Sequence, residues 1–293
     1  MPDLIRVRLP LVNVYLLGEP GGPWVLVDAG LPGTASLIRR AAQAHFGDTG
    51  PEAVVLTHGH LDYIGGLRAL LNLWDVPVYA HPMELPYLTG RSAYPPPDPT
   101  VGGSMSQVSP LFVPGPFDFR PLLRALPADG SLPHLPGWRW LFTPGHSPGH
   151  VSLWREDDRV LIAGDAFVTT RQESVLPAMT LRPRQVRRPP AYYTPDWDAA
   201  RASVQTLAAL RPELAATGHG QPMSGGALRT GLTELADHFE TQGQPRHGRY
   251  VRRPALTDMN GVQELPPAPS PWPRRLLMAG VALGVWRLLR SRA

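Results

Sequence analysis

The chain of 293 residues is long enough for one large domain or two small ones, and its hydrophobic content of 43% permits an ordinary core. It contains no cysteine, which excludes disulfides, thiolate metal sites and cysteine nucleophiles, so any metal must be held by histidine and carboxylate side chains. All 28 basic residues are arginines, and against 24 acids the net charge is only +4, which does not predict a nucleic-acid-binding surface.

Strand-like and helix-like segments alternate through the first 80 residues. A helix is expected from Thr34, because apolar residues recur there at helical spacing. Pro77 marks its segment as an edge strand, because proline cannot donate to a ladder. The strands expected here cover residues 4–18, which Pro10 divides into two, and residues 24–28, 53–56 and 76–80. This alternation predicts a layered α/β domain.

The rest of the chain continues the pattern around two irregular segments. Residues 82–136 and 171–193 are rich in proline, and the first is too long for an ordinary connection, so we expect a lid-like insertion there. Helices are expected after the cap Thr194–Pro195 and from about Leu228 to Phe239. The expected strands cover residues 138–142, 151–154, 160–163 and 214–217.

A cluster of polar residues, Thr57-His58-Gly59-His60-Leu61-Asp62, follows directly after the expected strand 53–56. His58 and His60 are two residues apart, so their side chains lie on one face of extended backbone. Two converging imidazoles supply two of the four ligands that a zinc-type ion needs, and Asp62 continues the same alternation. The alternative is a pair of surface histidines at a strand end.

Three further strand ends carry a histidine or an aspartate beside glycine, at His146, Asp165 and His219. Taken singly, each could be a capping or turn residue. Together with the cluster at 58–62 they supply six hard or borderline ligands and no sulfur, which suits zinc, manganese or iron.

The motifs THGHLD, PGHSPGH, GDA and TGHG, in this order and spacing, resemble those of the metallo-β-lactamase fold superfamily of hydrolases. The resemblance covers roughly residues 4–240 and implies an αββα sandwich of two mixed sheets with helices on the outer faces. It implies a first metal held by His58, His60 and His146. It also implies a second metal held by Asp62, Asp165 and His219, with Asp165 bridging the two ions.

Tyr63 departs from the pattern, because the family usually has a histidine there as a ligand of the second metal. A neutral tyrosine, with a pKa near 10, is a poor ligand. We therefore expect Tyr63 to contact a ligand or to face the substrate, and the occupancy of the second site stays open.

Other residues near the motifs have supporting roles or none. Asp28 is expected to accept a hydrogen bond that orients a ligand, Thr57 to hold the first motif through its hydroxyl, and His150 to fix the loop of His146 rather than bind metal. A group of arginines and tyrosines either lines a pocket for an anionic substrate or forms a solvated loop. The solvated loop is slightly favoured, because runs of charged residues usually face water. The group is Arg171, Arg182, Arg184, Arg187, Arg188, Tyr192 and Tyr193.

The resemblance implies a metal-dependent hydrolase with two ions, of which zinc is expected and manganese or iron are alternatives. Asp62 would orient the attacking water or accept its proton, and Tyr63 or the second metal would stabilise charge on the substrate. The substrate is expected to be a small cytoplasmic ester, lactone or thioester. The alternative is a mononuclear iron oxygenase acting on a sulfur compound, a class that uses two histidines and one carboxylate.

We expect a catalytic domain over residues 1–250, a proline-rich linker over 251–273 and a tail over 274–293. No basic segment followed by an apolar core opens the chain, so a cytoplasmic protein without a secretory signal is expected. The apolar run Leu276 to Trp286 has 11 residues, roughly 16 Å of helix, too short to span a bilayer. Its flanking arginines suit contact with a membrane surface, and docking on the domain or on a partner subunit is the alternative. The oligomeric state stays open.

Overall fold

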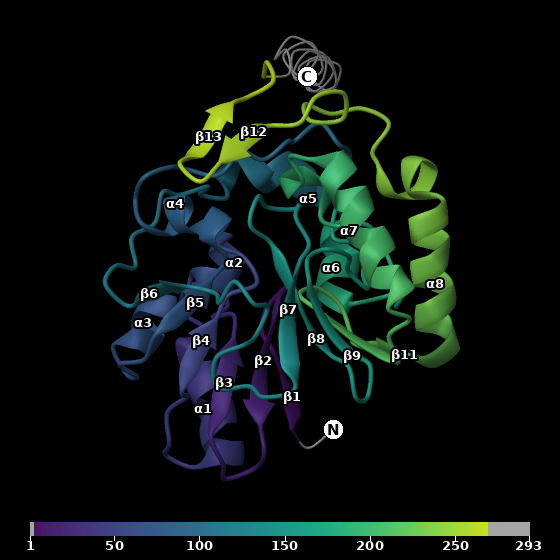
Figure 1. Cartoon of the computed structure of the whole chain (residues 1–293). Helices are drawn as coiled ribbons and strands as arrows, with labels where there is room; N and C mark the ends of the chain where they lie inside the picture. The colour runs from purple at the N-terminus through teal and green to yellow at the C-terminus, as the bar shows by residue number, and fades with distance from the viewer. Residues whose placement is uncertain (1–2, 269–293) are drawn as a thin grey trace, which may run out of the picture.

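Two β-sheets lie face to face, with helices on both outer faces, in the computed structural model of residues 3–268 (Figure 1). The first sheet has the order β1-β2-β3-β4-β5-β6 and is antiparallel from β1 to β3 and parallel from β3 to β6. Its strands are β1 (Leu4–Arg8), β2 (Asn13–Gly18), β3 (Trp24–Val27), β4 (Ala53–Val55), β5 (Val78–Ala80) and β6 (Leu123–Ala125). The expected αββα sandwich is therefore confirmed.

The second sheet has the order β11-β10-β9-β8-β7, in which only β9 and β10 run parallel. Its strands are β7 (Trp138–Phe142), β8 (Val151–Arg155), β9 (Val160–Gly164), β10 (Leu214–Thr217) and β11 (Met223–Ser224). All four strands expected in this half of the chain are present, and β11 adds a fifth.

Alternate residues of the strands face the two sides of each sheet, as the period of extended backbone requires. Leu17 and Val27 of the first sheet pack against Leu153 and Ile162 of the second, and this buried layer joins the sheets. The strand residues between them face outward and are covered by helices, so both sides of each sheet are apolar.

The helices divide between the two outer faces. The first sheet is covered by α1 (Ala35–Phe46) and α3 (Leu67–Leu71), and the second by α7 (Trp197–Ala209) and α8 (Gly225–Asp237), as Figure 1 shows. The shorter elements are α2 (Leu61–Ile64), η1 (Pro82–Glu84), α4 (Leu85–Leu88), α5 (Ser104–Val108), η2 (Ser109–Leu111), α6 (Val175–Thr180), η3 (Ala191–Tyr193) and η4 (Phe239–Gly243).

Two local predictions were wrong. The strand at Val78–Ala80 is not at an edge, because β6 from the segment 82–136 pairs with its outer side. Pro77 precedes the strand, and its carbonyl accepts a hydrogen bond from the Val54 amide. No ladder hydrogen bond needs a donor at this position, so the missing N–H of the proline is not destabilising. The helix expected after Thr194–Pro195 is present, but its predicted cap is wrong. The Asp196 carboxylate accepts from the Ala199 amide and is the N-cap, so the helix begins at Trp197.

Part of the expected linker is folded. Strands β12 (Leu256–Asp258) and β13 (Gly261–Glu264) form a hairpin, which contacts the segment 82–136 where the Val262 amide donates to Ser92 Oγ at 3.2 Å. The expected tail lies outside the described residues. Within residues 3–268, no helix has the length and apolar character needed to cross a membrane.

Candidate metal centre

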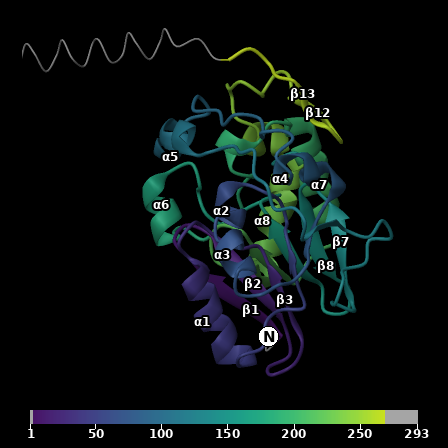
Figure 2. The same ribbon diagram turned by 90° about the vertical axis from the view of Figure 1, so that its left-hand side faces the viewer.

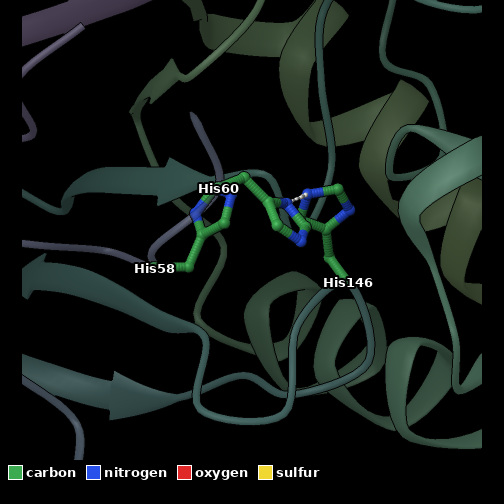
Figure 3. A group of neighbouring side chains, drawn as sticks. All are labelled: His58, His60 and His146. Atoms are coloured by element: carbon green, nitrogen blue, oxygen red, sulfur yellow. Dashed lines mark hydrogen bonds between the residues drawn. The ribbon is translucent and has the colours of Figure 1, made fainter. Parts of the chain in front are cut away.

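Three buried histidines converge between the two sheets. His58 and His60 follow β4 and His146 lies in the β7–β8 loop, and one ring nitrogen from each lies within 4.8 Å of the other two. Figure 3 shows the His60 and His146 rings turned toward each other, with His60 Nδ1 3.0 Å from His146 Nε2. The strand ends that the sequence indicated therefore meet at one place.

His58 is oriented by a short hydrogen-bond chain that begins at Asp28. The Thr57 hydroxyl lies 3.0 Å from Asp28 Oδ2 and 3.1 Å from His58 Nδ1. Because the hydroxyl proton is directed to Asp28, its oxygen is left to accept from His58 Nδ1–H. His58 Nε2 then carries a lone pair, and this fully buried atom has no hydrogen-bond partner. Asp28 was expected to accept a hydrogen bond that orients a metal-binding residue. It does not contact His58 directly and acts on it through the Thr57 hydroxyl.

An unpartnered buried nitrogen is costly unless something else binds it. Burial, together with the neighbouring histidines, holds the pKa of His58 and His146 well below the ordinary value, and burial lowers the pKa of His60 to about 3. Neutral imidazoles are the ligating form. The residues present therefore fit a bound metal ion, and the chain is a metal-binding protein.

His60 and His146 are held from their outer sides. The Tyr193 ring stacks on His60 with centroids 4.4 Å apart, and the Tyr94 ring meets it edge-on at 4.8 Å. His146 Nδ1 lies 3.4 Å from Thr194 Oγ1, whose own proton goes to the Pro190 carbonyl. His146 Nε2 therefore faces the centre with its lone pair.

A second cluster adjoins the triad. His219 Nε2 lies 3.1 Å from Asp165 Oδ2 and 3.4 Å from Asp62 Oδ2, and His146 Nε2 lies 3.3 Å from the same Asp165 oxygen. Asp165 Oδ2 thus stands between the two clusters, where a bridging ligand would be. All six ligands expected from the sequence are therefore brought together.

The backbone of Leu11 sets the tautomer of His219. Its carbonyl accepts from His219 Nδ1 at 2.6 Å, so that Nδ1 carries a proton and Nε2 faces the carboxylates. Leu11 has a φ of 67°, in the left-handed region that residues with a side chain rarely adopt. No sequence pattern indicated this residue.

The charges of the second cluster are coupled. Burial opposes charge, but the two carboxylates outweigh it and raise the pKa of His219 to about 9. Burial would raise the pKa of Asp165, yet His219 and His146 hold it below the ordinary value. Burial raises the pKa of Asp62 to about 6, with His219 opposing. A cation bound here would take the place of the proton on His219 Nε2.

Tyr63 contacts the carboxylate of Asp165. Its hydroxyl donates to Asp165 Oδ1 at 2.7 Å, the side chain is fully buried, and burial with the nearby Asp165 and Asp62 raises its pKa well above the ordinary value. Tyr63 is thus a neutral donor that does not line the cavity beside the cluster. The expected role of stabilising charge on the substrate does not fit this position, because its hydroxyl is engaged by Asp165.

His150 holds the backbone of Asp165. Its Nε2 accepts from the Asp165 amide at 2.9 Å, so Nδ1 carries the proton and donates to Thr143 Oγ1 at 2.9 Å. Burial lowers its pKa to about 4, which keeps the ring neutral. Both nitrogens are used, in keeping with the expectation that His150 fixes a loop.

Glu84 is a buried carboxylate beside the centre that the sequence did not reveal. It is fully buried, and its Oε1 accepts from Ser147 Oγ at 2.7 Å and the Gly149 amide at 2.8 Å. Its Oε2 accepts from the Gly59 amide at 2.9 Å and from the Tyr94 hydroxyl. One carboxylate from the segment 82–136 therefore joins the loop of His58 and His60 to the loop of His146.

A cavity of about 80 Å³ opens onto the two clusters. Its walls are apolar and aromatic, and its polar lining consists of the cluster residues and Gln172. The lining residues are Leu11, Leu31, His60, Leu61, Asp62, Met105, Phe112, His146, Asp165, Gln172, Pro190, Tyr192, Tyr193 and His219. Of the arginine–tyrosine group, only the two tyrosines line this cavity, so the arginines do not form an anionic pocket here.

Replacing Tyr63 tests its hydrogen bond. Tyr63→Phe keeps the ring and leaves Asp165 Oδ1 without its donor, so we expect metal affinity or turnover to fall about 10–100-fold. Affinity is measured by competition with a chelator. Tyr250→Phe is the matched control, because that buried hydroxyl donates to the Pro96 carbonyl. Equal affinity and turnover in wild type and Tyr63→Phe would contradict the role.

Replacing Glu84 tests the junction of the two ligand loops. Glu84→Gln offers one acceptor oxygen and turns an NH₂ group toward donors, so a backbone amide of one loop loses its partner. We expect metal affinity to fall about 10–100-fold. The control is Glu173→Gln, a buried carboxylate paired with Arg188. If both variants lose stability alike and bind metal like the wild type, Glu84 is only structural.

Comparisons with known proteins agree with this arrangement. The model of the metallo-beta-lactamase superfamily matches residues 7–219. The probable metallo-hydrolase YflN of Bacillus subtilis (strain 168) is 45% identical over 239 residues, which cover 80% of this chain and 90% of that protein. A structure titled TTHA1623 in a di-iron-bound form is 26% identical, with a TM-score of 0.52, and the match covers 80% of this chain and 96% of that one.

A further similar structure is the metallo-beta-lactamase family protein TTHA1429 from Thermus thermophilus. It is 24% identical with a TM-score of 0.54, over 82% of this chain and 80% of that chain, and so supports the fold alone. Because the superfamily match spans most of the chain and includes all six converging histidines and aspartates, this protein belongs to the metallo-β-lactamase superfamily and is an enzyme of that fold.

Proposed function

We propose that the protein is a metal-dependent hydrolase of a small, uncharged ester, lactone or thioester with an apolar acyl group. The observation that carries the proposal is the cavity, whose walls are leucine, methionine and aromatic side chains and whose polar end is formed by the two clusters. The relative with 45% identity is named a probable metallo-hydrolase, which supports the reaction class.

The charge of the cavity favours an uncharged substrate. No arginine lines it, so a carboxylate or phosphate on the substrate would lose its hydration without gaining a cationic partner from the walls. These walls would surround the acyl group, whereas Asp62 and Asp165 at the polar end would be neutralised by bound ions. An apolar acyl group, by contrast, gains from contact with Met105 and Phe112.

His58, His60 and His146 would hold one ion, and Asp62, Asp165 and His219 a second, for which we propose zinc. Bound zinc supplies hydroxide at neutral pH, because it lowers the pKa of water from 15.7 to about 7. The residues around the centre hold the metal-binding side chains in position. Asp165 is fixed from one side by Tyr63 and from its own backbone by His150, so its free oxygen cannot turn away.

Asp62 is the group placed to accept a proton. It lines the cavity and its side chain is 28% exposed, whereas Asp165 and His219 are almost fully buried. Burial raises its pKa to about 6, which still leaves it a carboxylate at neutral pH, and a bound cation would lower that pKa.

Asp62→Asn tests this role. The amide keeps the size of the side chain and one oxygen, but it cannot accept the proton, so we expect turnover to fall about 10²–10⁴-fold. Elemental analysis of the same preparation shows whether metal is retained. Asp237→Asn, at an exposed position on α8, is the control. Full activity with metal retained in Asp62→Asn contradicts the proposal.

A pair of substrates tests the class. We expect the zinc-loaded protein to hydrolyse the butyryl ester of a chromogenic phenol with a kcat/KM at least about tenfold above that of the hemisuccinyl ester. The two acyl groups are similar in length and differ by a carboxylate, so the ratio reports the charge of the cavity. Equal rates, or preference for the hemisuccinyl ester, would contradict an uncharged substrate.

The iron oxygenase alternative gives a different result in the same preparation. One iron per chain with oxygen uptake on addition of a thiol, and no hydrolysis of either ester, would favour it over the hydrolase. Two zinc ions per chain and no oxygen uptake favour the hydrolase.

A further inference from the structure

Exposed apolar side chains gather on two short helices beside the cavity. Eleven large hydrophobic residues are exposed in the described part of the chain, and six of them lie on α5, η2, α6 or the residues next to them. Leu111 is 79% exposed, Leu176 71% and Met179 61%. Leaving such residues in water is unfavourable, so a cluster of them indicates a contact surface.

The two helices form one surface although about 70 residues separate them. The Val175 amide donates to Ser104 Oγ at 3.1 Å, and the Met105 amide donates to the Glu173 carbonyl at 2.9 Å. Figure 2 shows α5 and α6 next to each other at one edge of the molecule. We call the segments 104–113 and 171–184 the apolar face.

The apolar face is the outer side of a wall of the catalytic cavity. Met105 and Phe112 of the same segment point inward and line the cavity, while Leu111 between them is exposed. Phe112 stacks on Tyr193, which in turn stacks on His60. A molecule that contacts the apolar face is therefore separated from the cavity by the layer of Met105 and Phe112.

Arginines flank the exposed apolar side chains. Arg171 precedes α6, Arg182 and Arg184 follow it, and all three are exposed. Arg8 Nη2 approaches the Met179 carbonyl at 3.4 Å and adds a fourth cation. The one acidic residue of the face, Glu173, is buried and paired with Arg188 at 3.1 Å. The exposed charge of the face is thus entirely positive.

We propose that the apolar face docks on an anionic lipid surface. Protruding leucines can enter the boundary between head groups and acyl chains, while arginines beside them remain at the level of the phosphates. A second copy of the chain fits less well, because a two-fold contact would place the arginines of one copy against those of the other. An apolar substrate held in the membrane would then reach the cavity without crossing water.

Sedimentation of the full chain with lipid vesicles tests the proposal. We expect binding to vesicles of phosphatidylcholine mixed with phosphatidylglycerol, and weaker binding to phosphatidylcholine alone. Leu111→Ser/Leu176→Ser should weaken binding at least about tenfold. Arg171→Gln/Arg184→Gln should weaken binding to the anionic vesicles about fivefold per arginine. Leu73→Ser/Met259→Ser replaces exposed apolar residues in turns outside the apolar face; it is the matched control and should bind like the wild type.

The outcomes separate clearly. If the Leu111→Ser/Leu176→Ser variant binds anionic vesicles like the wild type, another part of the chain binds them and the proposal is overturned. The same holds if the wild type does not bind, or if light scattering without lipid shows oligomers that this variant abolishes. Residues 269–293 are present in every protein compared, so their contribution is constant. Because binding is measured without turnover, its failure leaves the proposed hydrolase untouched.

Discussion

The interaction on which the site depends is the contact of one carboxylate, Asp165, with both halves of the sandwich. Its Oδ1 accepts from Tyr63, which follows β4 of the first sheet, and its Oδ2 lies near His146 and His219 of the second. Its amide donates to His150. Because the carboxylate is buried, it stays charged only while these donors surround it. The position of each strand end is thereby coupled to the others, and a shift of either sheet would leave a buried charge without a partner.

Three of the histidines are oriented by a hydrogen bond at one ring nitrogen, which leaves the other nitrogen free to bind a metal. Thr57, Thr194 and the Leu11 carbonyl each engage Nδ1 of a histidine, so that Nε2 of His58, His146 and His219 faces inward. Ordering these rings before a metal binds removes part of the entropic cost of forming the site. Among the three histidines of the triad, His58 Nε2 is a buried nitrogen without a hydrogen-bond partner, which a cation would satisfy. Metal binding is therefore expected to stabilise the fold itself.

His58 and His60 could be predicted from the period of extended backbone. Asp62 lies in α2 and does not continue that period, so it, His146, Asp165 and His219 could be predicted only from their places after strand ends and from the resemblance to the family's motifs. The layered fold followed from the alternation of strands and helices. Glu84 and the Leu11 carbonyl could not be predicted, because each acts across a long sequence separation and neither has a local signature. The strand at Val78–Ala80 was predicted to be an edge strand from a local feature, the proline at position 77. Whether a strand lies at an edge depends on distant parts of the chain, and here β6, more than 40 residues later, pairs with it.

The tyrosine at position 63 changes more than one ligand position. A phenol there donates a hydrogen bond to Asp165 and removes one of the oxygens that this carboxylate could offer to cations. It also needs space, and glycine supplies it, because a Cβ at Gly218 would overlap the Tyr63 hydroxyl and crowd Asp165 Oδ1. Tyr63 and Gly218 are therefore one structural unit, and replacing Gly218 by alanine would disturb the carboxylate as directly as replacing the tyrosine. In this chain the position of the Asp165 carboxylate is thus set by hydrogen bonding to Tyr63 and by the space that Gly218 leaves, at the point where the family pattern has a further ligand.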